Sequence, residues 1–378
     1  ELQLITCRCL YNLFETNPDT VSSAVNKDVI TALQGKLIEI SYIDLAEQVL
    51  ETLEFVSRVH GREILRSGGL VACLQYLDFF TIHAQRKAVT IVANSCACIR
   101  PNDFQYIQEV FATLNGIFIN TTDQNILSKI LNTLYGVCSG LGKEQDKLEK
   151  LFDISIIQRI IRLISNTDFD LESKLKSLDI LSQLVTASAN FSKQVIGSCN
   201  VVEMLLSCFN GFRKSPTSPL HETLMFVPKT LISSISRFIV LLLPTEEEQV
   251  LSIDPPKNID LSNVKDEYIR LVKEITPLLW EIYTNTVDFD IRRCVLIAFS
   301  RICCSLNGSN VSTIDKQVIN MIASSLTQNK SIFESSKGNR LISGGLLVGV
   351  LSLTSTMTAK YASEFLPAFK REGIFDLL

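Results

Sequence analysis

Few side chains in this sequence are arranged for catalysis or cofactor binding. The three histidines are His60, His83 and His221, and none stands beside an obvious nucleophile. A transfer or hydrolytic site needs a nucleophile, an oriented base and an oxyanion-binding group together. The sequence has no phosphate-binding loop, no Gly-x-Ser-x-Gly motif and no His-Glu-x-x-His motif. The carboxylates of Glu51 and Glu54 lie three residues apart, an ordinary spacing for a helix surface. We expect no catalytic residue and no cofactor.

The eleven cysteines are better explained as core residues than as metal ligands or disulfides. There is no Cys-x-x-Cys pair, and the pairs Cys7/Cys9 and Cys96/Cys98 are spaced so that their members point to different faces of a helix. Zinc needs four converging nitrogen or sulfur ligands, whereas a free cysteine commonly packs as a small apolar side chain. We predict no metal site and reduced cysteines, as in a cytoplasmic or nuclear protein.

A ladder of polar and aromatic side chains is the best candidate for a binding site. The residues of this polar ladder are Tyr11, Glu15, Glu51, Phe55, Arg58, Arg86, Lys87, Thr90, Asn94 and Asn132. Most of them stand six or ten residues after the start of a repeated apolar stripe, on the side of each helix that faces away from its core. Aromatic, amide and charged groups side by side could hold an extended peptide or a folded protein. The alternative is a solvated helix face without a ligand.

The stripe that positions the ladder recurs along the chain. Leu45, Val49, Leu50, Leu53 and Val56 stand at offsets 0, 4, 5, 8 and 11, which places them on one face of a helix. Further copies are Ala84–Ser95, Ile126–Val137, Ile291–Ile302 and Ile342–Leu353, a partial copy is Ile5–Leu13, and weaker copies begin at Leu171 and Leu231. A period of about 40 residues with helical content is typical of armadillo and HEAT repeats.

Each repeat is predicted to contain a long helix, a corner and two further helices. Gly68-Gly69 supplies the corner in the clearest unit, since paired glycines permit positive φ and close backbone approach. One such unit cannot bury its own apolar faces, so it must stack on its neighbours. The sequence therefore predicts an all-α, armadillo/HEAT-like, right-handed superhelical solenoid, with the stripe helices lining its inner side.

Composition excludes several other classes. A chain of 378 residues is too long for one ordinary globular core, whereas a solenoid grows in one dimension. Net charge is −4 and no block of Lys or Arg exceeds two residues, so we expect no nucleic-acid partner. The longest clean apolar run, Phe238 to Leu243, is far shorter than the roughly 20 residues of a membrane span. The first residue is not Met, and it lies within a predicted helix. We therefore interpret the chain as part of a longer protein.

Three regions are predicted. Residues 1–210 carry regular armadillo repeats, residues 211–263 form a loop-rich and proline-rich irregular region, and residues 264–378 return to armadillo-like repeats. The middle region contains the loops Arg213–Glu222 and Thr245–Asn263, with an apolar helix between them. Long loops without secondary structure are usually functional or disordered.

One known family shares several segments with this chain. The stretch Ile64 to Leu77, followed by Ala84 to Asn94, resembles an armadillo repeat. Phe55-Val-Ser-Arg-Val-His60, Ser67-Gly-Gly-Leu70, Tyr76-Leu-Asp-Phe-Phe80 and Ala84 to Asn94 resemble the armadillo region of the HECT-type ubiquitin ligases of the ubiquitin-fusion-degradation pathway. The resemblance is dense over about residues 42–165 and diffuse afterwards.

The resemblance implies a parent protein that transfers ubiquitin through a cysteine of a separate HECT domain, so that no cysteine of this chain inherits that role. It implies protein substrates, ubiquitin or ubiquitin chains, and the proteasome as partners. Two alternatives stay open. One is a nuclear-transport adapter that reads basic peptides, which predicts an acidic groove with a Trp and an Asn in each repeat, whereas among the clear copies only Asn94 keeps that Asn and none keeps the Trp. The other is a scaffold without a ligand on the ladder.

Overall fold

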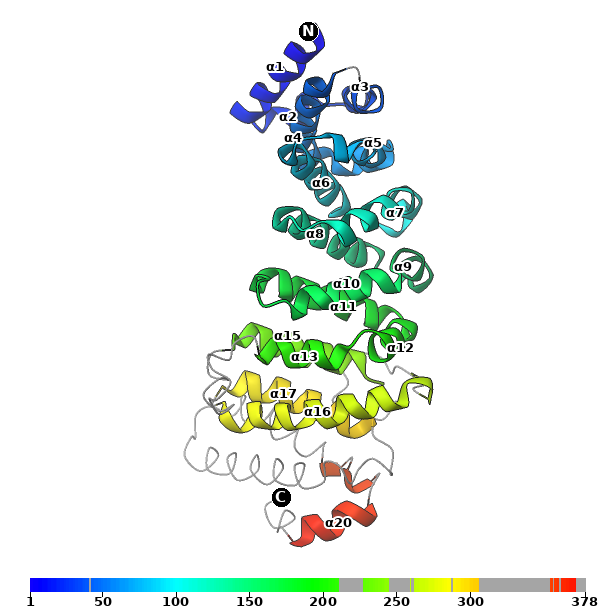
Figure 1. Cartoon of the computed structure of the whole chain (residues 1–378), viewed down its shortest axis with the longest axis vertical. Coiled ribbons are helices and arrows are strands. Elements are labelled where there is room, and N and C mark those ends of the chain that lie inside the picture. The colour runs from blue at the N-terminus through cyan, green and yellow to red at the C-terminus, as the bar shows by residue number, and fades with distance from the viewer. Residues whose placement is uncertain are drawn as a thin grey trace. The chain divides into compact units, whose positions relative to one another are not determined.

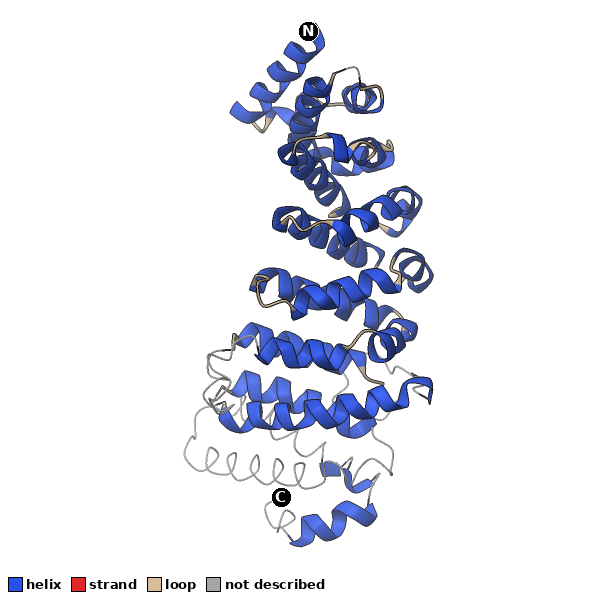
Figure 2. Ribbon diagram, in the orientation of Figure 1, coloured by secondary structure: helices blue, strands red, loops and turns tan. Residues whose placement is uncertain are grey.

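The computed structural model describes residues 1–40, 42–210, 227–244, 259, 262–286, 288–305, 354–355, 357–359 and 362–371. Helices and short turns account for these residues, and none of them lies in a strand (Figure 2). The chain divides into two compact units, Glu1–Arg159 and Ile160–Leu378. No helix in the described ranges is both long and apolar enough to cross a membrane.

The first unit is a stack of long helices backed by shorter ones (Figure 1). Its helices are α1 (Leu2–Thr16), α2 (Thr20–Ala24), α3 (Lys27–Ile38), α4 (Ile43–Arg66), α5 (Gly69–Leu74), η1 (Leu77–Phe79), α6 (Ile82–Cys96), η2 (Pro101–Asp103), α7 (Phe104–Asn120), α8 (Gln124–Leu141) and α9 (Gln145–Leu151). The long helices α1, α4, α6 and α8 pack one on the next. Helices α3, α5 and α7 form the second layer, in which α5 contacts both α3 and α7.

The second unit repeats this organisation. Its helices are α11 (Leu171–Ala187), α12 (Ala189–Ser198), α13 (Val201–Asn210), α15 (Lys229–Leu242), η3 (Ser262–Val264), α16 (Lys265–Asn285), α17 (Phe289–Ser305) and α20 (Ala362–Arg371), and α10 (Ile154–Ser165) spans the boundary between the units. Helix α15 packs between α11 and α17, while α16 contacts α13 and α17. Helix α15 coincides with the apolar helix predicted between the two loops of residues 211–263.

The predicted apolar stripe forms the core of the long helices. All five stripe positions of α4 are at most 4% exposed, and those of α6 and α8 are at most 2% exposed. The copies in α15 and α17 are buried as well, whereas the α11 copy begins with the half-buried Leu171 and Leu175. Burying one such aliphatic side chain contributes about 1.5–3 kcal/mol. The copy at Ile342–Leu353 lies outside the described residues.

The prediction that α1 carries the first copy of the buried stripe is wrong. In α1, Ile5 and Leu13 are 51% and 43% exposed, and the buried side chains are Cys7 and Phe14 instead. The reason is the number of neighbours: α4 is covered by α1 on one side and α6 on the other, whereas the main contacts of α1 among the described elements are with α4 and the short α2. The same helical pattern is buried only where a second long helix closes over it.

The predicted corner after α4 is present at Gly68. Its φ of 78° is left-handed, a conformation that glycine adopts without the steric cost of a side chain. Upstream, α4 departs from helical geometry at His60, where φ is −109° and ψ is 28°. Helix α4 thus contains a long helix and a short helix that are joined by a kink at His60. The corner at Gly68 follows the end of the short helix.

Two places hold neighbouring long helices at close range. A methyl group on Gly136 of α8 would lie 2.8 Å from the carbonyl oxygen of Cys96 in α6, and one on Gly61 of α4 would lie 2.9 Å from the Cα atom of Ser95. Both contacts are with backbone atoms, so no side-chain rotation could relieve them. The spacing of α4, α6 and α8 therefore depends on the absence of side chains at these crossings.

A buried carboxylate fixes the second layer to the first. Asp103 of η2 is fully buried and accepts hydrogen bonds from Nε of Arg62 at 3.2 Å, from Nε of Arg66 at 2.8 Å and from the backbone N–H of Arg100 at 3.1 Å. Burial by itself would raise the pKa of Asp103, but the hydrogen bonds from Arg66 and Arg100 and the charges of both α4 arginines outweigh it and lower the pKa. This cluster joins the end of α4 to the start of α7.

Most of the region predicted to be irregular, 211–263, lies outside the described residues, as does much of 264–378. The division into three regions therefore stays a prediction. Pro277 lies inside α16.

Candidate functional site

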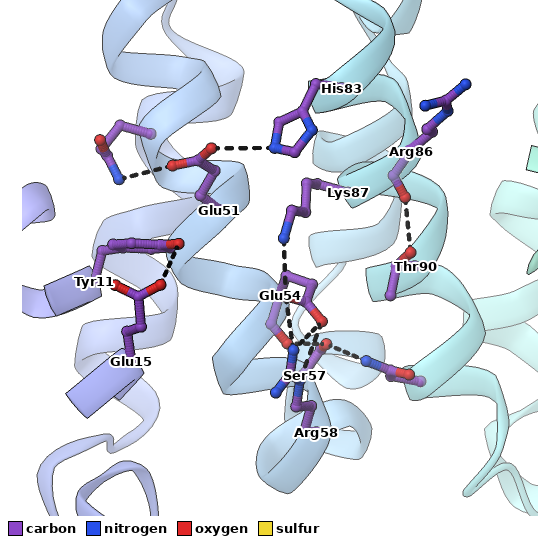
Figure 3. A network of polar contacts seen from close by, with 12 residues as sticks. Tyr11, Glu15, Glu51, Glu54, Ser57, Arg58, His83, Arg86, Lys87 and Thr90 are labelled. Atoms are coloured by element: carbon purple, nitrogen blue, oxygen red, sulfur yellow. Dashed lines mark hydrogen bonds and ion pairs between the residues drawn. The ribbon is translucent and has the colours of Figure 1, made fainter. Parts of the chain in front are cut away.

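The centre of the polar ladder is a carboxylate that joins α4 to α6. Glu54 of α4 is 5% exposed. Its Oε1 accepts hydrogen bonds from Nε and Nη2 of Arg58 at 3.0 and 2.8 Å, and its Oε2 accepts from Nη2 of Arg58 at 3.0 Å and from Nζ of Lys87 at 3.3 Å. Arg58 is one helical turn away on α4, whereas Lys87 comes from α6 (Figure 3).

Two aromatic rings hold the outer side of this cluster. The guanidinium carbon of Arg58 lies 4.5 Å from the ring centroid of Phe55, within the range of a cation–π contact. The ring of Phe55 meets that of Tyr11 edge to face at 5.5 Å, and the hydroxyl of Tyr11 donates to Oε1 of Glu15 at 3.2 Å. Partial burial and the neighbouring Glu15 raise the pKa of the Tyr11 hydroxyl, so it keeps its proton. Helices α1 and α4 thus share one aromatic cluster.

Glu51 forms a second bridge from α4 to α6. Its Oε1 lies 3.4 Å from Nε2 of His83, and its Oε2 accepts from Nε2 of Gln48 at 3.2 Å. The His83 side chain is 66% exposed and that of Glu51 is 28% exposed, so this pair is open to solvent and to any partner. Figure 3 shows it on the same side of the helices as Lys87.

The α6 side of the ladder supplies hydrogen-bonding groups. Nδ2 of Asn94 donates to the hydroxyl of Ser57 at 2.9 Å, and that hydroxyl donates in turn to the backbone carbonyl of Glu54 at 2.7 Å. The Thr90 hydroxyl donates to the carbonyl oxygen of Arg86 at 2.8 Å. Asn94 and Thr90 are half-buried.

Arg86 connects the ladder to the next repeat. Its Nη2 donates to Oδ2 of Asp123 at 2.6 Å and its Nε to Oδ1 at 3.3 Å. Asp123 is also the N-cap of α8, where its Oδ1 accepts from the N–H of Ile126 at 3.0 Å. The hydrogen bond from Arg86 and those from the first turn of α8 lower the pKa of Asp123. One carboxylate therefore serves a helix cap and an ion pair together.

Six of the ten ladder residues are linked by contacts across α1, α4 and α6, through Glu54 and Ser57. They are Tyr11, Glu15, Phe55, Arg58, Lys87 and Asn94, while Glu51 forms its separate pair with His83. Arg86 and Thr90 lie beside them on α6, and Asn132 is half-buried on α8. That these residues bind a partner stays a prediction.

Sequence reasoning missed Glu54, Ser57, His83 and Asp123. Glu54 was expected to be an ordinary surface carboxylate, which is wrong, because α6 and Arg58 cover it. The spacing of Glu54 and Arg58, four residues apart on one helix, was a usable signal for their ion pair. Asp123, three residues before the Ile126 stripe, was a usable signal for an N-cap.

The described residues contain no group of three His, Cys, Asp or Glu side chains that could hold a metal ion. The cysteines in these ranges form no disulfide, and Cys7, Cys73, Cys96, Cys138, Cys199, Cys208 and Cys303 are buried. Burial raises the pKa of the Cys73 thiol to about 12, which suits a core residue rather than a nucleophile.

The fold defines the class of protein first: an all-α solenoid of armadillo-like repeats, as predicted. A crystal structure of an engineered protein matches 99% of this chain and 89% of its own with a TM-score of 0.54 at 13% identity. A designed armadillo repeat protein in complex with the peptide (KR)4 matches 72% of this chain and 98% of its own with a TM-score of 0.51 at 12% identity.

The sequence relatives are more specific. This chain is 49% identical over its full length to ubiquitin fusion degradation protein 4 of Saccharomyces cerevisiae, and it spans 26% of that protein. It is 46% identical over 124 residues to the E3 ubiquitin-protein ligase TRIP12 of Danio rerio, a match over 33% of this chain and 6% of the relative. Residues 1–66 match the family described as E3 ubiquitin-protein ligase TRIP12-like, TPR repeats. These matches confirm the predicted relationship to the repeat region of the ubiquitin-fusion-degradation ligases.

Proposed function

We propose that this chain is the substrate-recruiting region of a HECT-type E3 ubiquitin ligase in the ubiquitin fusion degradation pathway. Its relatives are ubiquitin ligases, and it spans about a quarter of the length of the yeast relative (26%). In this proposal the catalytic cysteine lies in another part of the parent protein, and the chain holds proteins that carry ubiquitin so that they are modified and degraded by the proteasome. The parent acts in the cytoplasm, the nucleus or both.

The observation that carries this proposal is the composition of the polar ladder. Side chains from three successive helices are fixed in place by one another, yet Arg58 and His83 remain more than half exposed. Preorganised polar and aromatic groups on rigid helices bind a partner with little loss of side-chain entropy. The ladder contains no Trp, and its central carboxylate is already paired with two cations, which gives no support to an adapter for basic peptides.

Two matched substitutions test the recruiting role. Glu51→Lys reverses a charge on the ladder, while Glu109→Lys makes the same change on an exposed residue of α7 in the other layer. We expect Glu51→Lys to weaken binding of a ubiquitin fusion or a ubiquitin chain by about tenfold, or about 1.4 kcal/mol. Glu109→Lys leaves the dissociation constant within about twofold of the original. Equal effects of the two substitutions would contradict a ladder-based site.

A crosslinking experiment locates the contact directly. A photoreactive phenylalanine analogue at Tyr11 is expected to crosslink to a ubiquitin-bearing protein, and the same group at Glu109 is not. In parallel, the chain incubated with ubiquitin, activating enzyme, conjugating enzyme and ATP is expected to form no thioester. A thioester on this chain would overturn its assignment as a recruiting region.

A further inference from the structure

Arg58 occupies a place on the ladder that a basic ligand would otherwise take. A guanidinium is held best by a carboxylate along one edge and an aromatic ring across one face. Arg58 has both, since Nε and Nη2 donate to Glu54 at 2.8 to 3.0 Å and the guanidinium lies over Phe55 at 4.5 Å. The place between Glu54 and the ring of Phe55 that a basic ligand would occupy is thus filled by Arg58.

An incoming basic side chain would have to displace this contact. Arg58 and Glu54 are one helical turn apart, so the internal pair is always in reach and a peptide arginine competes against a high effective concentration. Lys87 holds the second oxygen of Glu54 at the same time. Both oxygens of the carboxylate are therefore occupied.

The exposed part of the cluster is positive. Glu54 carries one negative charge and its side chain is 7% exposed, whereas the side chains of Arg58 and Lys87 carry two positive charges and are 53% and 25% exposed. Two other carboxylates lie nearby: Glu51 is 3.4 Å from Nε2 of His83, and Glu15 accepts from the Tyr11 hydroxyl, which is neutral and leaves the charge of Glu15 in place. Among the described residues, Nη1 of Arg58 has no hydrogen-bond partner. A preorganised cation with free donors faces solvent between α4 and α6.

We propose that Arg58 determines the specificity of the ladder: it excludes basic segments and selects an acidic segment of a partner protein. A carboxylate of the partner accepts from the outer edge of Arg58, with Lys87 adding charge, while Thr90 and Asn94 lie on α6 beside them. This inference rests on the proposed function, because it names the kind of segment that the recruiting face takes.

Fluorescence polarisation with three labelled octapeptides tests the selectivity. The peptides are an alternating Asp-Glu sequence, an alternating Lys-Arg sequence and a neutral Gly-Ser sequence. We expect the full chain to bind the acidic peptide more tightly than the neutral one, with affinity that falls as salt is added, and to bind the basic peptide no better than the neutral one. Tighter binding of the basic peptide would overturn the inference.

The deciding variant is Arg58→Met, which keeps an unbranched side chain over Phe55 and removes the guanidinium. It is expected to weaken acidic-peptide binding by about tenfold or more and to create binding of the basic peptide, because one side of Glu54 becomes available. The double variant Arg58→Met with Glu54→Gln loses that new binding. The control variant Arg293→Met changes neither affinity. It removes an arginine of α17 whose side chain is also more than half exposed and close to a carboxylate of its own helix. Circular dichroism melting verifies that each variant is folded.

The outcomes separate this inference from the proposed function. If Arg58→Met leaves both peptide affinities unchanged while Glu51→Lys still disrupts binding of a ubiquitin-bearing protein, the specificity role of Arg58 fails and recruitment stands. If the acidic peptide binds through Arg58 but no ubiquitin-bearing protein binds or crosslinks, recruitment fails and the acidic specificity stands.

Discussion

Replacing Gly136 by alanine tests how strictly the stacking of the long helices is set. Gly136 lies inside α8, where alanine is intrinsically better than glycine by about 1 kcal/mol. The new Cβ atom would lie 2.8 Å from the carbonyl oxygen and 3.1 Å from the carbonyl carbon of Cys96, and 3.3 Å from the backbone nitrogen of Ala97. All three are backbone atoms of α6 or its C-cap, so relief requires movement of a whole helix. Overpacking of this kind costs about 1–3 kcal/mol.

A matched control isolates the clash from helix propensity. Gly116 lies inside α7, is exposed, and has no packing neighbour within 4 Å of the position that an added methyl group would take. Gly116→Ala is expected to stabilise the protein by about 0.5–1 kcal/mol. Gly136→Ala is expected to be less stable than Gly116→Ala by about 1–3 kcal/mol, the cost of the clash.

The assay is urea unfolding followed by circular dichroism, with the midpoint and the slope fitted for each variant. Because cooperativity can break down in arrays of repeats, the exposure of the Cys96 and Cys138 thiols to a labelling reagent is followed in the same titration. Both thiols are buried close to the α6–α8 crossing. If Gly136→Ala gains as much stability as Gly116→Ala, the close approach of these helices does not constrain them and the reasoning fails.

Three other predictions concern carboxylates and thiols of the first unit. Asp103→Asn weakens the charge-assisted hydrogen bonds from Arg62 and Arg66 and is expected to destabilise the first unit by about 2 kcal/mol. Because folding lowers the pKa of Asp103, its contribution is complete above the unfolded value of about 3.9 and is lost as the pH falls through the folded value. When the free energy of unfolding is measured against pH in the acid range, its slope should therefore be smaller in Asp103→Asn than in the original protein. Identical slopes for the two proteins would contradict this role of Asp103. Asp123→Ala removes the cap of α8 and the partner of Arg86, and we expect a loss of about 1–2 kcal/mol in chemical denaturation, whereas an unchanged midpoint would rule out a stabilising cap. In the native state, a thiol reagent should label the exposed Cys9 and Cys98 quickly and leave the buried Cys73, Cys96 and Cys138 unlabelled until unfolding, and rapid labelling of Cys73 would show that its burial is incomplete.

The repeat architecture could be predicted from the sequence because its cause is local. The five stripe positions of Leu45–Val56, all apolar, and those of Ala84–Ser95, of which four are apolar, each lie on a single helix face, and that face is buried. The exposed Ile5 and Leu13 of α1 mark the limit of this reasoning. Spacing predicts which residues share a face, but burial depends on whether another helix covers that face.

The ladder was predictable as a set of positions but not as a network. Offsets along one helix place Glu51 and Phe55 on the same side, since that follows from helix geometry alone. The contacts of Glu54 with Lys87, of Glu51 with His83 and of Arg86 with Asp123 join residues 32 to 37 positions apart across two helices. They depend on the distance and rotation between helices, which no spacing within one helix contains.

The double role of Asp123 links partner occupancy to the integrity of α8. An anionic partner that drew Arg86 away would leave the carboxylate to the cap alone, and one that reinforced the pair would hold the first turn of α8 more firmly. Thermodynamic reciprocity requires that fraying of that turn alter the affinity for such a partner by the same factor. Hydrogen exchange of the Ile126 amide would then report, from a neighbouring repeat, whether the surface beside it is occupied.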